Sequence, residues 1–152
     1  MTASTALRCG ACLDKPPAYD ATIAAVDYGA PIDQLVVSLK FGSRLALAPL
    51  FARMLRDALL LSHAPLPALP TILIPVPLGA ERLAQRGFNQ ALEIARPLSR
   101  ALGIKLEARL AIRLRDTDAQ STLHPEQRRK HMRDAFAISH EFIDIIRDRH
   151  IG

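Results

Sequence analysis

Two arginines, an asparagine and a glutamine lie close together in a segment that could bind an anion. Arg82 and Arg86 carry fork-shaped donors suited to phosphate, and Asn89 and Gln90 stand where a helix is expected to begin. The first amides of a helix lack partners within it, and its dipole adds positive potential there. The spacing predicts a phosphate-binding loop leading into a helix start. Asn89 also fits a plain helix cap, a role compatible with ligand contact.

Local signals predict the elements on either side of this loop. An apolar strand over residues 71–76 is stopped by prolines, and the basic loop that follows turns at Gly87. A helix then runs from Asn89 to about residue 102, where a glycine closes it. Pro97 lies inside this pattern and predicts a kink or an early end.

The remaining elements alternate between strands and helices. Upstream we expect a strand over 21–28, a helix over 31–40 ended by Phe41-Gly42, and a helix over 49–61. In the helix over 49–61, the residues expected to face the core are Leu50, Met54, Ala58 and Leu61. Downstream we expect short strands at 104–106, 110–114 and 135–138, and helices after Pro125 and over 141–147. The pattern predicts one α/β domain with a mainly parallel sheet flanked by helices.

Charge is unevenly distributed along the 152 residues, which carry a formal net charge of +5. Residues 81–133 hold 12 Lys and Arg against 6 Asp and Glu, whereas the rest of the chain holds 8 against 9. The positive charge therefore favours phosphate-bearing partners, either small ligands or nucleic acid. Aromatic residues make up only 5% and Trp is absent, which argues against a single-strand stacking platform.

No membrane or targeting segment is predicted. The first eight residues contain no apolar stretch typical of a signal peptide, so we expect a cytoplasmic protein. Residues 58–80 are uncharged, but their five prolines would break a spanning helix repeatedly. We expect no membrane partner.

Several short motifs occur together in a fixed order. They are Cys9-Gly-Ala-Cys12, Leu39-Lys-Phe41, Ile74-Pro-Val-Pro-Leu78, Arg86-Gly-Phe-Asn-Gln-Ala91 and Arg115-Asp-Thr-Asp-Ala-Gln120. Together they resemble the ComF family of phosphoribosyltransferase-like proteins, which is associated with competence and DNA uptake in bacteria. The resemblance covers nearly the whole chain, and the Arg-Gly-Phe-Asn-Gln element is its most specific part.

The resemblance implies a phosphoribosyltransferase-like fold that binds phosphoribosyl pyrophosphate together with Mg²⁺. By position, Arg82 and Arg86 would meet phosphate oxygens, while Asn89 and Gln90 would present amides at the helix start. The remaining candidates for ligand contact have structural explanations that fit equally well, namely a lysine at a solvated helix end and polar residues that hydrogen-bond a loop backbone. Those candidates are Lys40, Thr117, Gln120 and Arg128. No residue is assigned to catalysis.

Two features expected from the resemblance are missing from the sequence. Such enzymes hold ribose and its phosphate with an acidic pair and a Gly/Thr-rich turn, and neither occurs here. A zinc ribbon requires four ligands, whereas only Cys9 and Cys12 are present, so zinc is expected only if a second Cys pair is supplied. A redox pair is one alternative for these cysteines, although a thioredoxin-like context is not evident, and two free thiols are the simplest interpretation. We therefore expect a chain truncated at both ends, with a zinc-ribbon remnant and linker over 1–18 and the amino-terminal portion of the transferase-like domain over 19–152.

Three functions are compatible with this sequence. The first is a phosphoribosyltransferase-related protein, whose binding of phosphoribosyl pyrophosphate is expected to be weak until the acidic pair and turn are restored. The second is a basic competence factor without transferase activity, for which single-stranded DNA is a predicted partner. The third is a truncated fragment with no activity of its own. The salt dependence of DNA binding separates the second function from the first, because each phosphate contact makes DNA affinity fall more steeply as salt rises.

Overall fold

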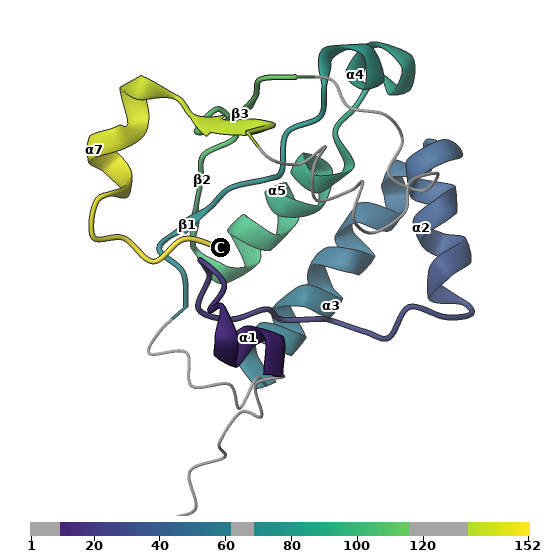
Figure 1. Cartoon of the computed structure of the whole chain (residues 1–152). Coiled ribbons are helices and arrows are strands. Elements are labelled where there is room, and N and C mark those ends of the chain that lie inside the picture. The colour runs from purple at the N-terminus through teal and green to yellow at the C-terminus, as the bar shows by residue number, and fades with distance from the viewer. Residues whose placement is uncertain (1–9, 62–68, 116–133) are drawn as a thin grey trace, which may run out of the picture.

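The computed structural model describes residues 10–61, 69–115 and 134–152 (Figure 1). Helices make up most of the regular structure in the described part, with short strands between them, and no helix there is long and apolar enough to cross a membrane. The helices are α1 Gly10–Asp14, α2 Ile32–Phe41, α3 Ala48–Leu61, α4 Ala80–Arg86, α5 Gln90–Leu102 and α7 Ile143–Ile146. The strands are β1 Ile72–Leu73, β2 Lys105–Leu106, β3 Ala111–Arg113 and β4 Phe136–Ile138, and the 3-10 turns are η1 Leu45–Leu47 and η3 His140–Phe142.

β1 is the central strand of a small parallel sheet. It pairs with β2 in a register that places Ile72 opposite Lys105. A parallel bridge joins Ile72 to Ile151, with the Gly152 amide donating to the Ile72 carbonyl at 2.9 Å. β3 and β4 form a separate antiparallel pair. The chain is thus a mixed helix and sheet protein, in agreement with the predicted α/β class, and the parallel arrangement holds for the β1 sheet only.

The principal hydrophobic core lies where α3 and α5 pack together beside β1 (Figure 1). Its buried residues are Ala52 of α3, Leu73 of β1, Leu98 of α5 and Ile104 just before β2. Burial of such aliphatic side chains stabilises a fold by roughly 1.5–3 kcal/mol for each large one.

The ends of α2 and α5 agree with the sequence signals. Pro31 and Gly42 flank α2 as its caps. Asn89 caps the start of α5, and Gly103 ends it in a left-handed conformation with φ 67°. The early end predicted at Pro97 is wrong, because α5 continues to residue 102. Buried Ala95 and Leu98 hold α5 against its neighbours on both sides of the proline, which offsets the one lost backbone donor.

The basic segment predicted as a loop is a helix, α4. Its sequence, Ala-Glu-Arg-Leu-Ala-Gln-Arg, contains only residues that favour helix. Gly79 precedes it in an extended conformation, and Gly87 ends it at φ 78°, where a side chain would be strained. The turn predicted at Gly87 is confirmed. The loop prediction failed because prolines and a glycine can flank a short helix as readily as they flank a loop.

The strand predicted over 21–28 is wrong. These residues adopt no strand, and no described strand pairs with them. Only Ile23 and Ala25 are even half-buried, and Tyr28 is 74% exposed. An alternating apolar pattern forms a strand only where a partner accepts its backbone groups and a core accepts one face. Neither condition is met in this segment.

The core face predicted for α3 is rotated from the observed one. The buried residues are Ala48, Phe51 and Ala52, whereas Leu61, predicted as core, is 73% exposed. The shift of about one residue corresponds to about 100° around the helix. Most of α3 is apolar, so its sequence permits several buried faces. Contact with α5 selects one of them.

Candidate anion-binding site

The segment after β1 forms a helix–turn–helix connection whose geometry depends on Asn89. Its Oδ1 accepts a hydrogen bond from the Ala91 amide at 3.0 Å, which is the N-cap bond of α5. Its Nδ2 donates to the Val76 carbonyl at 3.0 Å. The predicted capping role is confirmed, and the second bond fixes the start of α5 against the segment that leaves β1.

Replacement of Asn89 tests this connection. We expect Asn89→Ala to lower the free energy of unfolding by about 1 kcal/mol, because it removes the cap acceptor, and the bond to Val76 is lost with it. Asn89→Asp keeps the acceptor and should retain most of the stability. Urea unfolding followed by circular dichroism provides the measurement. An Ala variant as stable as the wild type would contradict the assigned cap.

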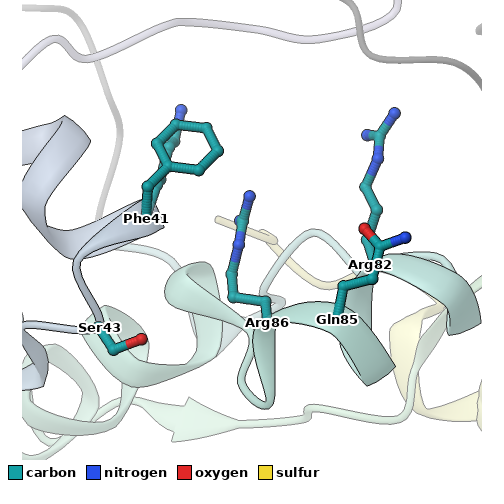
Figure 2. Close-up of a pocket in the computed structure, with 6 residues that line it drawn as sticks. Phe41, Ser43, Arg82, Gln85 and Arg86 are labelled. Carbon is teal, nitrogen blue, oxygen red and sulfur yellow. The ribbon is translucent and has the colours of Figure 1, made fainter.

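A basic cavity of about 190 Å³ lies between the end of α2 and one face of α4 (Figure 2). α2 and the turn after it contribute Lys40, Phe41 and Ser43, and α4 contributes Arg82, Gln85 and Arg86. Arg82, Gln85 and Arg86 share one face because they are three and four positions apart on a helix. Figure 2 shows the side chains of Phe41, Arg82 and Arg86 extending to the same side.

The side chains make this cavity suitable for an anion. Lys40, Arg82 and Arg86 are cationic and half-buried, and none of the six lining residues is acidic. Three positive charges in a concave site attract a multiply charged anion, and partial burial reduces solvent screening. Lys40 and Arg86 lie in the last turns of their helices, so the positive potential comes from side chains rather than from helix dipoles.

Arg86 is held by residues from two other helices. Its Nη1 donates to Oε1 of Gln90 in α5. Its guanidinium carbon lies 5.3 Å from the centroid of the Phe41 ring, within the range of a cation–π contact. The Gln90 amide oxygen therefore accepts a hydrogen bond from Arg86, and ligand contact by Gln90 stays a prediction.

A second cavity of about 360 Å³ is lined by Leu83 of α4 together with residues that precede α4 and residues of α5. Its lining is mainly apolar, including Leu78, Leu83 and Leu92, and an ion pair of 2.9 Å joins Arg96 to Glu93 at its edge. α4 thus contributes residues to both a basic cavity and a mainly apolar one. Sequence analysis missed Phe41, Ser43 and Gln85 as lining residues. The spacing of Gln85 between the two arginines would have revealed it had α4 been recognised as a helix.

Asn89, which was also predicted to contact a ligand, lines the second cavity rather than the basic one. Thr117, Gln120, Arg128 and Cys9 lie outside the described residues, and Cys12 lies in α1 without a described side chain. Their ligand roles, and the boundary at residue 18, stay predictions. Within the described ranges, no group of three or more His, Cys, Asp or Glu could hold a metal ion.

Comparison with curated proteins identifies relatives over most of this chain. DNA utilization protein YhgH of Salmonella typhi is 35% identical over 134 residues, which cover 87% of this chain and 59% of that protein. The Escherichia coli K12 protein of the same name is 34% identical over 135 residues, with the same shares. Competence protein F of Haemophilus influenzae is 32% identical over 138 residues, covering 88% of this chain and 59% of that protein. The chain thus spans about three fifths of the length of these relatives. No family model matches the chain. No solved structure matches it.

Proposed function

Because the chain is related to the ComF family, we propose that it is a phosphoribosyltransferase-like protein that binds pyrophosphate or phosphoribosyl pyrophosphate and takes part in DNA utilization. The observation that carries the proposal is the convergence of Lys40, Arg82 and Arg86 on one cavity. These residues come from two helices that are separate in the sequence. Three cations match the several negative charges of a pyrophosphate group.

The position of α4 in the chain supports a transferase-like arrangement. β1 has parallel neighbours, and the segment leaving its carboxyl end leads directly into α4. In open parallel sheets, ligands bind beyond the carboxyl ends of the strands. The proposed chemistry is electrostatic, since the arginines would stabilise pyrophosphate as it departs and would also orient it.

Mg²⁺ belongs to the proposal through the resemblance alone. The six residues that line the basic cavity provide no carboxylate ligand, so the cavity itself does not fit a bound Mg²⁺. We derive no step from the metal. The zinc proposal likewise depends on a second Cys pair.

Calorimetric titration at low salt tests ligand binding directly. We expect pyrophosphate to bind with a dissociation constant of about 0.1 mM, or about −5.5 kcal/mol. Phosphoribosyl pyrophosphate should bind no more than a few-fold tighter, because the sequence lacks the acidic pair and turn that hold ribose and its phosphate. Titrations with and without Mg²⁺ measure what the metal adds. If pyrophosphate produces no heat at low salt, the proposed binding function is wrong.

DNA binding without transferase activity is the second candidate function. It is favoured by the excess of Lys and Arg over residues 81–133 and by the names of the relatives, which refer to DNA utilization and competence. A duplex binder should lose about 0.9 log units of affinity for each phosphate contact per tenfold rise in salt. Steep salt dependence that pyrophosphate does not compete away would favour this candidate. Binding of neither ligand would favour a chain with no activity of its own.

A further inference from the structure

We propose that Phe41 and Gln90 are positioning residues that hold the Arg86 guanidinium in place for an anion in the basic cavity. The inference rests on the proposed function for the ligand, while the arrangement itself is visible in the ligand-free protein. Neither residue needs to touch the anion for this role. Phe41 acts through the face of its ring, and Gln90 acts through one N–H donor of the guanidinium.

Three helices meet at Arg86. It is the last residue of α4, Phe41 is the last residue of α2, and Gln90 is the first residue of α5. Gln90 follows Arg86 by four positions, yet the two lie on different helices because Gly87 ends α4 in a left-handed conformation. The bonds of Asn89 to Val76 and Ala91 fix the start of α5, and they therefore fix the position of Gln90.

The two contacts restrain different motions of the side chain. The Phe41 ring limits how far the guanidinium can swing away from it, with the guanidinium carbon over the ring at 5.3 Å from its centroid. A hydrogen bond from Nη1 to the Gln90 oxygen limits rotation of the guanidinium within its own plane. An arginine carries much rotamer entropy, so restraint before binding lowers the entropy lost when an anion is bound. The remaining N–H donors of Arg86 are available in a fixed fork.

This arrangement also explains an exposed phenylalanine. Phe41 is 74% exposed at the rim of the cavity, where its burial contributes little to the hydrophobic core. Lys40 precedes it in the sequence and lines the same cavity. The end of α2 therefore supplies two groups to the cavity: the charge of Lys40 for the anion, and the ring of Phe41 for the Arg86 guanidinium.

The first test is spectroscopic and needs no ligand. The Nε–Hε resonance of Arg86 can be assigned by its loss in Arg86→Lys. We expect the ring current of Phe41 to displace its chemical shift from the value of a solvent-exposed arginine. Phe41→Leu should abolish the displacement, and Phe41→Tyr should retain it. Gln34→Met, which changes an exposed glutamine of α2 outside the cavity, should leave the resonance unchanged. An undisplaced resonance in the wild type would overturn the inference.

The second test measures pyrophosphate affinity in a double-mutant cycle. We expect Phe41→Leu to weaken binding about threefold and Gln90→Met about tenfold. On the Arg86→Ala background, each change should have no further effect, because both residues act through Arg86. Phe41→Tyr should restore wild-type affinity. Fully additive losses would show that Phe41 and Gln90 act by another route and would refute their positioning role.

The two tests separate this inference from the proposed function. Pyrophosphate binding that is indifferent to Phe41 and Gln90 would overturn the inference and leave the function standing. A displaced Arg86 resonance without any pyrophosphate binding would support the restraint of Arg86 by Phe41 and would refute pyrophosphate as the ligand.

Discussion

Arg86→Ala is expected to weaken pyrophosphate binding about tenfold, and the Arg82→Ala, Arg86→Ala double variant is expected to abolish detectable binding. Each arginine lines the basic cavity and can donate charge-assisted hydrogen bonds, which contribute roughly 1.5–3 kcal/mol each. Arg86→Lys should recover only part of the affinity, since lysine keeps the charge but lacks the planar fork. Calorimetric titration of each variant with pyrophosphate at fixed low salt gives the comparison.

Arg100→Ala is the matched control for this result. Arg100 is exposed on α5 and lines a different cavity, so its removal lowers the net charge equally without changing the basic cavity. We expect Arg100→Ala to bind pyrophosphate within about twofold of the wild type, because exposed charges at a distance are screened by salt. If Arg100→Ala and Arg86→Ala lose affinity equally, overall charge rather than the cavity governs binding.

Phe51→Ala is expected to cause the largest loss of stability, about 3–5 kcal/mol. Phe51 is buried on α3, where truncation removes its transfer free energy and leaves a cavity. Leu61→Ala on the same helix should change the free energy of unfolding by less than about 0.5 kcal/mol, because Leu61 is 73% exposed. Urea unfolding of both variants gives the two values.

This pair of variants also tests the rotation of α3. The sequence predicted Leu61 in the core, whereas the structure exposes it and buries Phe51. If Leu61→Ala is the more damaging change, the predicted face is right and the observed packing of α3 against α5 is wrong. Circular dichroism of each folded variant controls for loss of helix.

The ends of the helices were predictable because they depend on neighbouring residues. Pro31 and Gly42 flank α2, and Asn89 and Gly103 flank α5, as the sequence indicated. Capping and left-handed turns are local, so they need little information from the rest of the chain. The prediction of a strand over 21–28 was wrong for the opposite reason, since a strand needs a partner that the segment itself does not specify.

The candidate site was predicted as a set of residues but not as an arrangement. Sequence analysis named Lys40, Arg82 and Arg86, and these are the three cations that line the basic cavity. It placed the arginines in a loop before a helix start, whereas they lie on one face of α4. It did not foresee the hydrogen bond between Arg86 and the Gln90 side chain, and ligand contact by Gln90 stays a prediction.

The sequence by itself determined the mixed helix and sheet class, the ends of α2 and α5, and the basic residues of the segment after β1. Only the tertiary structure decided which face of α3 is buried and which side chains share a cavity. The physical reason is that caps and propensities act within a few residues, whereas a cavity requires surfaces distant in sequence to meet. Packing of the helices brings Lys40 and Phe41 of α2 to Arg82 and Arg86 of α4. That meeting places the three cations around one cavity.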